Sequence, residues 1–344
     1  MKIAHVVWGM KTGGIETMLV NIINEHVKTE DVYLYIVNDF VDEDIVANIS
    51  PKCTIYRLKR RPGSKNPISI LRLNLWLMSH NPDIIHVHSN NLSKLIFFKN
   101  NIVRTIHDIN NMTGEYSRMK ALYAISNAVK EFTINQGFPD VIEVNNGIRV
   151  EDVRKKHDQK PQDGIYKLVQ LGRMYTPHKG QDLLVRTLTI LLKNGVKNFK
   201  MHFIGDGSSM EDVKELSEEL GLSDYIVFEG RKTPNEVYRK LCEYDLFVQP
   251  SRTEGFGLTV AEAVAAKLPV LVSNLPGPME IIDNGLLGMS FETENIEDLA
   301  AKLEIILNGG YDYSLVEKAY KRVVELYDVS VTAKKYIDEY KKII

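Results

Sequence analysis

The stretch at residues 251–264, SRTEGFGLTVAEAV, constrains the fold of this chain more than any other part. It lies between two short apolar runs, Leu-Phe-Val and Val-Leu-Val. Its two glycines, Gly255 and Gly257, precede a helical pattern that begins near Leu258. Continuous apolar runs of this length are typical of parallel strands buried on both faces. The stretch therefore predicts a strand, a glycine loop, a helix and a second strand, which is the repeating unit of α/β proteins.

The same loop predicts a ligand site. Glycines let the backbone approach a ligand closely, and the start of the next helix presents unpaired N–H groups that favour a phosphate. Two carboxylates, Glu254 and Glu262, frame the loop. Glu262 either accepts hydrogen bonds from ribose hydroxyls or forms a T-x-x-E capping box with Thr259. Glu254 either holds hydroxyls of a transferred sugar or is a turn residue, and the stretch alone leaves both pairs of interpretations open.

The beginning of the chain repeats the order of strand, glycine loop and helix. Residues 3–9 predict a buried strand, and residues 15–27 carry the apolar spacing of a helix. The G-x-G-x-x-G fingerprint of dinucleotide-binding proteins is absent between them. Gly13 and Gly14 therefore either approach a phosphate or a sugar, or make a tight turn into the helix.

Further apolar runs predict a doubly wound sheet in each half of the chain. In the first half, strands are predicted at residues 31–37, 54–58, 84–88, 102–107, 121–125 and 141–145. In the second half, they are predicted at residues 167–172, 200–204, 225–229, 246–249 and 270–273. The polar segment 149–165 lacks apolar periodicity, so we place a linker between two domains there.

Residues 67–80 predict a helix that follows a basic loop. Its apolar side chains share one face, which predicts that this face packs on the core; they are Ile68, Leu71, Leu75, Leu77 and Met78. Trp76 and the basic loop offer the alternative of a membrane contact. The loop cations are Lys59, Arg60, Arg61 and Lys65. They either meet a membrane surface or an acceptor phosphate, or belong to a solvated turn.

Several polar residues stand at the ends of predicted strands, where α/β sheets place ligands. His86 and His88 alternate on one strand, and packing is a better interpretation than a metal pair because no further ligand is spaced to complete a site. His107 either contacts a sugar hydroxyl or packs. The D-x-D pattern at residues 42–44 opens a probable helix, where acids favour the helix dipole, so we reject it as a metal site.

A second glycine-flanked loop, GRMYTPHKG, follows the predicted strand at 167–172. It holds two cations, Arg173 and Lys179, ahead of a helix. Two cations in such a loop would neutralise a diphosphate and the charge that develops on it as it leaves. Gly205 and Arg231 stand in further turns at strand ends.

Length and charge restrict the class of protein. A chain of 344 residues is long enough for two ordinary domains, and a net charge of −2 gives no bulk attraction to nucleic acid. Cys53 and Cys242 are far apart and lack metal-ligand spacing, which suits a reducing cytoplasm. The first residues are too polar for a signal peptide, and no apolar run reaches the about 20 residues of a membrane span. We therefore expect a cytoplasmic protein.

Four motifs, in this order and spacing, resemble the C-terminal domain of retaining family-4 glycosyltransferases: GRMYTPHKG, IGDG, PSRTEGFGLTVAEAVAAKLPVLVSNLPGPMEII and NGLLG. Gly13-Gly14, PDIIHVH, TIHD and NNGI resemble the first domain of the same family. The resemblance implies a GT-B fold, an α/β architecture in which two Rossmann-like domains face each other across a cleft. It implies domains at residues 1–150 and 151–329, with a last helix, 330–344, that crosses back to the first domain.

The resemblance also implies roles for these residues. Arg173 and Lys179 would stabilise the diphosphate leaving group, and Glu262 would bind ribose. Glu254 and His107 would contact the donor sugar near its reacting carbon. The remaining donor-binding positions would be Gly13, Gly14, Gly205, Arg231, Gly255, Phe256, Gly257 and Leu258. Three departures from the family pattern remove no proposed functional group: a GRMYTPHKG loop longer by about one residue, Lys267 in place of a glycine, and Asn145 in place of a proline.

The expected activity is a retaining, metal-independent transfer of a sugar from a UDP- or GDP-sugar to a glycan or lipid-linked acceptor, in bacterial surface polysaccharide assembly. No metal or other cofactor is expected, because the resemblance implies a metal-independent family, in agreement with the rejected D-x-D pattern. A sugar-nucleotide 2-epimerase of the same fold is an alternative, and it would turn over without an acceptor. A non-enzymatic, two-lobed sugar-binding protein is another, and free sugar but not nucleotide would stabilise it. Fold alone does not decide among these functions.

Overall fold

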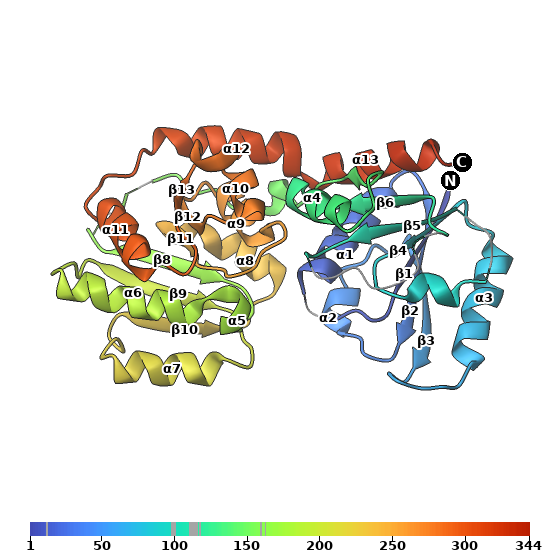
Figure 1. Cartoon of the computed structure of the whole chain (residues 1–344), viewed down its shortest axis with the longest axis horizontal. Coiled ribbons are helices and arrows are strands. Elements are labelled where there is room, and N and C mark those ends of the chain that lie inside the picture. Colours follow the sequence, from blue (N-terminus) through green and yellow to red (C-terminus); the bar gives the residue numbers. More distant parts are fainter. Residues whose placement is uncertain (12, 98–100, 110–115, 117, 159, 162) are drawn as a thin grey trace. The chain divides into compact units, whose positions relative to one another are not determined.

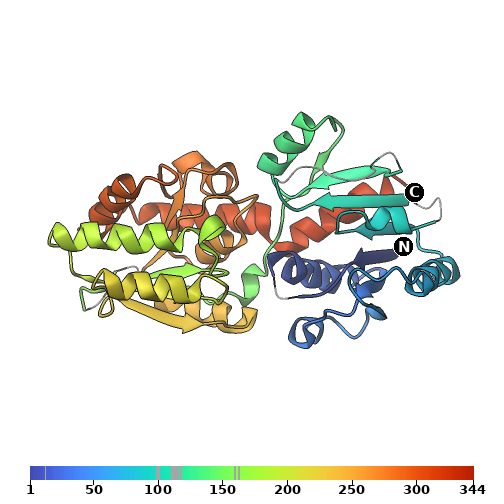
Figure 2. The same ribbon diagram turned by 60° about the horizontal axis from the view of Figure 1, so that its bottom comes forward.

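The chain divides into two units, each with its own parallel sheet (Figures 1 and 2). The structure is a computed structural model that describes residues 1–11, 13–97, 101–109, 116, 118–158, 160–161 and 163–344. Unit 1 comprises Met1–Ile148 and Leu326–Ile344, and unit 2 comprises Arg149–Glu325.

Unit 1 is built on seven parallel strands in the order β3-β2-β1-β4-β5-β6-β7. They are β1 (Lys2–Val7), β2 (Asp31–Asn38), β3 (Thr54–Arg60), β4 (Ile84–Val87), β5 (Asn101–Ile106), β6 (Ala121–Ala124) and β7 (Ile142–Glu143). The strand order reverses between β1 and β4, and α/β sheets place ligands at the carboxyl ends of strands at such a switch point.

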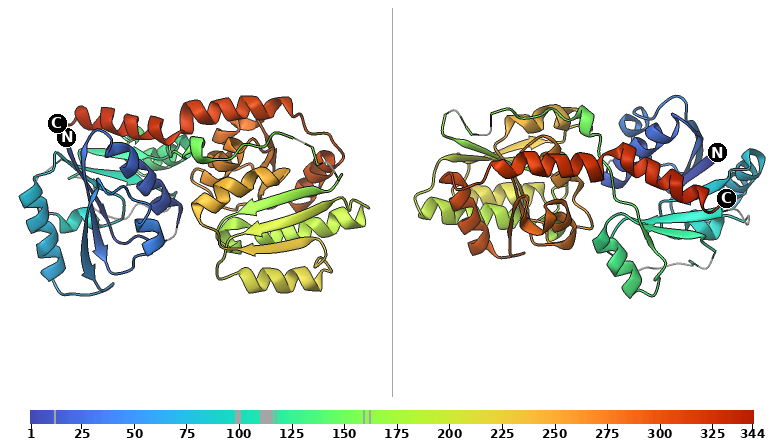
Figure 3. Two further views of the ribbon diagram at one scale, coloured as in Figure 1. Left: turned by 180° about the vertical axis from the view of Figure 1, so that it is seen from behind. Right: turned by 90° about the horizontal axis from the view of Figure 1, so that it is seen from above.

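The helices of unit 1 cover both faces of this sheet (Figure 3). They are α1 (Gly14–His26), α2 (Glu43–Val46), α3 (Ile68–His80), η1 (Leu92–Leu95), α4 (Asn127–Asn135) and α13 (Val329–Lys341). Side chains alternate along β2, so that Leu34 and Ile36 pack with α1 while Tyr35 and Val37 pack with α3. The expected return of the last helix to the first domain is confirmed, because Tyr340 of α13 is hydrogen-bonded to His86 of β4.

The D-x-D pattern lies at the start of α2. The Asp42 side chain accepts a hydrogen bond from the Asp44 backbone N–H (3.1 Å) and caps the helix. The interpretation of this pattern as a helix start is therefore confirmed.

Helix α3 contradicts the prediction for residues 67–80. Leu73 and Leu77 face the core, whereas the stripe expected to face it is exposed: Ile68 by 58%, Leu71 by 50%, Leu75 by 60% and Met78 by 56%. The period of the apolar residues predicted the helix correctly. It did not identify the buried face, because α3 carries apolar residues on two sides.

Unit 2 is built on six parallel strands in the order β10-β9-β8-β11-β12-β13. They are β8 (Tyr166–Leu171), β9 (Phe199–Ile204), β10 (Ile226–Gly230), β11 (Leu246–Gln249), β12 (Val270–Ser273) and β13 (Met289–Phe291). The order reverses between β8 and β11, so the loops after these two strands lie at the switch point of this sheet.

The helices of unit 2 alternate with its strands. They are η2 (Val150–Asp152), α5 (Thr176–Lys179), α6 (Gln181–Lys193), α7 (Met210–Glu219), α8 (Pro234–Lys240), η3 (Leu241–Glu243), α9 (Leu258–Ala265), α10 (Pro276–Ile281), η4 (Asp283–Gly285), α11 (Ile296–Leu307) and α12 (Ser314–Tyr327), whose end extends into unit 1. Leu184 of α6, Val213 of α7 and Leu303 of α11 belong to one core cluster with Leu168 and Phe203 of the sheet.

The predicted linker, residues 149–165, begins as part of unit 2. The backbone N–H of Arg154 donates to Tyr238 O (2.9 Å), and that of Lys156 donates to Ala266 O (2.8 Å). Residues 159 and 162 of this segment lie outside the described residues. None of the helices in the described part of the chain has the length and apolar character needed to span a membrane.

Candidate active site

Three loops of unit 2 meet backbone to backbone at the carboxyl ends of β8, β9 and β11. A Cβ atom on Gly205, which has φ +141°, would lie 1.9 Å from Gly172 O. A Cβ atom on Gly180, which has φ +64°, would lie 1.9 Å from Pro250 O. Only glycine fits at both positions, so these residues let the loop GRMYTPHKG pack between the loops that follow β9 and β11.

This packing brings two predicted site residues together. Lys179 Nζ donates to Glu254 Oε2 (2.7 Å), and Gln249 Nε2 donates to the same oxygen (3.2 Å). Lys179 lies in the short helix α5 rather than in an open loop, and its backbone O accepts from Gln170 Nε2 (2.9 Å). The switch point of unit 2 therefore carries a half-buried ion pair whose two members come from different loops.

Arg252, which was not among the predicted site residues, fastens these loops. Its guanidinium donates to Thr176 O (2.6 Å) and to both carboxylate oxygens of Asp182 (2.8 and 2.9 Å). Its backbone N–H donates to His178 O (2.8 Å). Its place within the stretch 251–264 was the only sequence evidence for it. Arg252 holds α5, and with it Lys179, against the glycine loop.

Arg173 lies on the same loop but is not brought into this pair. Its backbone O accepts from Gln181 Nε2 (3.0 Å), and its side chain is exposed. Within the described ranges, the Arg173 guanidinium has no ion-pair or hydrogen-bond partner. Arg231 is exposed after the edge strand β10, next to Gly205, since Gly205 N donates to Gly230 O (2.9 Å).

The glycine loop enters α9 without a capping side chain. Gly257 is the N-cap residue, with φ +104°, and no side chain donates or accepts a capping hydrogen bond there. Thr259 is the second residue of α9, so the capping-box alternative for Glu262 is wrong. A Cβ atom on Gly277 would lie 2.8 Å from the backbone of Gly255 and Phe256, which shows that the start of α10 packs closely on the loop.

Glu262 lies on α9 beside two residues that the sequence analysis did not select. Burial raises the pKa of its carboxyl to about 7, and the Tyr238 hydroxyl and the Arg149 guanidinium oppose this rise. The Arg149 guanidinium lies over the buried Tyr238 ring (5.5 Å to the centroid) and donates to Asn235 Oδ1 (3.1 Å). Glu262 is thus a carboxyl whose charge is costly until a donor reaches it.

The predicted residues of unit 1 lie at the carboxyl ends of β1 and β5. Gly13 is the N-cap residue of α1 in extended backbone, and Gly14 is the first residue of that helix. His107 follows β5, and burial lowers its pKa to about 4, with Arg104 lowering it further and Asp108 opposing. Both ring nitrogens of His107 are buried without a hydrogen-bond partner among the described residues. His107 is therefore a neutral ring at neutral pH.

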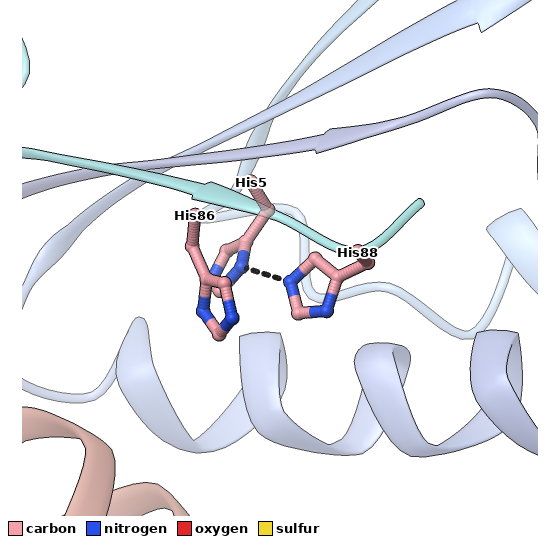
Figure 4. A group of neighbouring side chains, drawn as sticks. All are labelled: His5, His86 and His88. Atoms are coloured by element: carbon pink, nitrogen blue, oxygen red, sulfur yellow. Dashed lines mark hydrogen bonds between the residues drawn. The ribbon is translucent and has the colours of Figure 1, made fainter. Parts of the chain in front are cut away.

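His86 and His88 belong to a larger group of buried histidines (Figure 4). His5 Nδ1 and His88 Nε2 are hydrogen-bonded to each other (2.9 Å). Each of His5, His86 and His88 has one ring nitrogen within 4.8 Å of a ring nitrogen of the other two, close enough to share a metal ion. However, His86 Nδ1 is bonded to Tyr340 Oη (2.6 Å) and His86 Nε2 to Thr105 Oγ1 (2.8 Å). These hydrogen bonds occupy the His86 nitrogens that a metal would need, which favours packing.

Comparison with known proteins identifies the class of this chain. A family model described as glycosyl transferases group 1 matches residues 152–322, and one described as glycosyltransferase family 4 matches residues 12–152. This chain belongs to the family-4 glycosyltransferases. The two matched ranges of this glycosyltransferase meet where unit 1 gives way to unit 2.

Two curated relatives and one solved structure illustrate the similarity. The chain is 26% identical to the O-antigen biosynthesis glycosyltransferase WclY of Escherichia coli, over 86% of each chain. It is 26% identical to the poly(ribitol-phosphate) alpha-N-acetylglucosaminyltransferase of Staphylococcus aureus, over 74% of this chain and 49% of that enzyme. The matched part of this chain thus spans about half the length of the Staphylococcus aureus enzyme, and about half the length of another curated relative, an uncharacterized glycosyltransferase of Methanocaldococcus jannaschii.

The solved structure is that of Anabaena Alr3699/HepE in complex with UDP and glucose. The fold matches with a TM-score of 0.79 at 18% identity, over 99% of each chain. An identity this low shows the fold alone, and it supports the GT-B architecture of two Rossmann-like units.

Proposed function

We propose that this glycosyltransferase moves a sugar from a nucleotide-diphosphate sugar to a glycan or lipid-linked acceptor, with retention of the anomeric configuration. The observation that carries this proposal is the Lys179–Glu254 pair (2.7 Å) beside the glycine loop at the switch point of unit 2. The two side chains suit the two parts of a sugar diphosphate. The cation can bind the negatively charged phosphates, and the carboxylate can accept hydrogen bonds from the sugar hydroxyls.

The pair suggests how the donor is bound. Glu254 neutralises Lys179, which keeps a half-buried ammonium from being unpaired. An arriving diphosphate would take over Lys179, and Arg173, which is exposed and has no ion-pair partner in the described part of the chain, would add a second cation. Glu254 would then be released to accept hydrogen bonds from sugar hydroxyls. Glu262, on the neighbouring helix, would accept from the ribose.

The chemistry follows from these placements. The bond between the anomeric carbon and the phosphate oxygen breaks, and Lys179 and Arg173 stabilise the charge that develops on the diphosphate. The acceptor oxygen bonds to the same carbon on the face from which the diphosphate departs. The acceptor proton passes to the departing phosphate oxygen. The neutral His107 ring would contact the donor sugar. The two cations supply the charge that a metal would otherwise supply, so we propose a metal-independent reaction.

The relatives support the classes of substrate. Alr3699/HepE was crystallised with UDP, which favours UDP over GDP as the nucleotide. The names of the two curated relatives point to surface polysaccharides, and we propose a bacterial role of that kind at the cytoplasmic side, where nucleotide sugars are made. Arg60 donates to Asn38 Oδ1 (3.1 Å) and to Ser64 O, so it braces its own turn. The other loop cations, Lys59, Arg61 and Lys65, are exposed, and we propose that they meet phosphate, of the acceptor or of a membrane.

A donor screen tests the proposed function. UDP, GDP and their sugars are added to the protein, and the change in thermal unfolding is measured. A ligand at a hundred times its Kd stabilises by about 2.7 kcal/mol. We expect UDP and one UDP-sugar to stabilise, and turnover to require an acceptor. Stabilisation by free sugar without nucleotide would indicate a sugar-binding protein, and turnover without an acceptor would indicate an epimerase. An inverted product in the NMR spectrum would contradict retention.

A further inference from the structure

The outward face of α3 is apolar. Ile68, Leu71, Leu75 and Met78 follow one another at steps of three and four residues, so they form one stripe along the helix, which we name the α3 face. Each of the four side chains is exposed by half or more. The opposite side of α3 buries Leu73 and Leu77 against the sheet. A surface helix normally carries polar residues on its outer side, so the α3 face requires an explanation.

The apolar surface continues beside the helix. Asn74 of α3 accepts a hydrogen bond from the backbone N–H of Phe97 (2.7 Å) and donates one to Leu95 O (2.8 Å). The chain that follows η1 is thereby fastened to α3, and the side chain of Phe97 is 59% exposed. Nothing in the described part of unit 1 covers α3 on its outer side (Figures 1 and 3).

The surroundings of the α3 face are strongly basic. Residues 59–97 contain six lysines and arginines and a single acid, Asp83. Arg60 is engaged in its turn, but several cations are exposed and form no ion pair with any described residue: Lys59, Arg61, Lys65, Arg72 and Lys94. Arg72 lies on α3 itself, with its guanidinium over the ring of Trp76 (4.9 Å to the centroid).

We infer that α3 docks on an anionic phospholipid bilayer. Its apolar face enters the boundary between headgroups and acyl chains, as in other helices that lie in the plane of a membrane surface, and the surrounding cations contact lipid phosphates. A protein partner fits less well, because protein interfaces are depleted of lysine. A second copy fits less well too, because a two-fold interface would bring one basic rim against another.

Membrane docking through the α3 face is a property separate from the proposed sugar transfer, and it does not depend on that activity. Lysines alone would hold the protein at the membrane only at low salt, whereas the α3 face supplies an apolar contribution that salt does not screen. Binding that persists at high salt would therefore indicate docking on a membrane through the α3 face, rather than contact of the cations with the phosphate of a soluble acceptor. If the proposed activity were wrong, binding to lipid vesicles would still be expected.

Vesicle cosedimentation tests the inference. The vesicles contain phosphatidylcholine with or without phosphatidylglycerol, and the salt concentration is varied. Leu71→Gln with Leu75→Gln should lower the partition coefficient about tenfold at both low and high salt. Arg61→Gln with Lys65→Gln should lower it mainly at low salt. The control is Leu286→Gln with Ile305→Gln, two exposed apolar residues of unit 2, which should leave binding unchanged.

Tryptophan fluorescence supplies a second measurement. The chain has two tryptophans, and Trp8→Phe leaves Trp76 of α3 as the only reporter. We expect its emission to shift to the blue with anionic vesicles and to be quenched by brominated lipids. Circular dichroism should show each variant folded, since the changed leucines, arginine and lysine are exposed and Trp8→Phe keeps an aromatic ring at a partly buried position. Unchanged vesicle binding by the folded Leu71→Gln, Leu75→Gln protein would overturn the inference. So would loss of self-association without loss of vesicle binding, which would assign the α3 face to a second copy.

Discussion

The two units share a strand order and differ in the chemistry at its turning point. In both sheets the order reverses between the first and the fourth strand, at β1 and β4 in unit 1 and at β8 and β11 in unit 2. Unit 2 places charged side chains there, held in pairs such as Lys179 with Glu254. Unit 1 places buried histidines there, hydrogen-bonded to one another and to α13. The topology fixes where a site can form, and the residue types decide whether the site is charged.

The reason for the difference lies in what covers each edge. In unit 1, Tyr336 and Tyr340 of α13 are fully buried, and the Tyr336 hydroxyl is bonded to Thr105 Oγ1 (2.8 Å). Desolvation by this cover lowers the pKa of His86 well below its usual range. In unit 2, Lys179 and Glu254 are half-buried and form an ion pair (2.7 Å). Charge is therefore available to a ligand in unit 2, whereas the polar groups of the histidine cluster are bonded within the protein.

The largest expected effect is at the charged turning point. Lys179→Ala should reduce turnover by roughly 10²–10³-fold, because it removes one donor to the leaving group, about 2–4 kcal/mol at the transition state. Nucleotide diphosphate binding should weaken as well. Lys193→Ala, at the end of α6, is the control and should change neither. Steady-state kinetics and calorimetry with UDP measure both effects, and wild-type values for Lys179→Ala would remove this residue from the proposed site.

The second prediction contrasts the response of the two units to pH. Burial lowers the pKa of His26 in unit 1 to about 4, against 6.5 in an unfolded chain. Above pH 6.5 both states are neutral. Between pH 6.5 and 4 only the unfolded state takes up the proton, so the free energy of unfolding falls, by about 3 kcal/mol for this one residue. Glu262 has the opposite effect on the stability of unit 2. Its pKa is raised to about 7, so between pH 4.5 and 7 only the unfolded state releases the proton, and unit 2 loses stability as the pH rises.

Denaturant unfolding at several pH values measures this contrast. Both tryptophans, Trp8 and Trp76, belong to unit 1, so their fluorescence follows that unit. We expect His26→Gln to make the loss of unit 1 stability between pH 6.5 and 4 smaller by about 3 kcal/mol, while the other buried histidines of unit 1, such as His86 and His107, maintain the rest of the loss. An equally steep loss in that variant would assign the acid sensitivity to other groups.

The third prediction concerns the backbone contact that forms the site of unit 2. Gly180→Ala should destabilise unit 2 by about 2–3 kcal/mol, because the new Cβ would meet Pro250 O at 1.9 Å and the residue has φ +64°. Gly195→Ala is the matched control, since Gly195 also has positive φ, +84°, but no atom lies within 4 Å of its Cβ position. Thermal unfolding of both variants separates the steric effect from the backbone strain, and equal losses would show that the contact is unimportant.

The smallest effect is expected for Glu262→Gln. Because the structure excludes a capping box, a loss of affinity here reports contact with the ligand rather than helix formation. The preference for UDP over 2′,3′-dideoxy-UDP should shrink by about 1 kcal/mol, since Gln lacks the charge that strengthens bonds to the ribose hydroxyls. Glu215→Gln, on the exposed side of α7, is the control. Calorimetry with both nucleotides that gives an unchanged preference would exclude a ribose contact.

The strands could be predicted from the sequence with few errors, and some helices could not. Buried parallel strands are continuous apolar runs, and these stand out between polar loops. β13, α4, α10 and α12 were not predicted, and α5 was expected to be part of a loop. β13 has only three residues, whereas α12 buries Val316, Ala319 and Val323 at helical spacing, a pattern that the sequence carried and that was overlooked. Of the candidate site, the sequence indicated the loops and most of their charged residues. It did not indicate Arg252, Arg149 or Tyr238, because their importance arises from neighbours distant in the chain.

The sequence by itself determined the alternation of strands and helices, the positions of the glycine loops and the motifs of the family. These are local properties of spacing and residue type, which act before the chain folds back on itself. Tertiary structure alone decided three matters. It paired Lys179 with Glu254, 75 residues apart in the chain; it joined His5 to His88; and it turned Ile68, Leu71, Leu75 and Met78 outward. Each depends on which surfaces meet, and a helix with two apolar sides buries the one that its sheet covers.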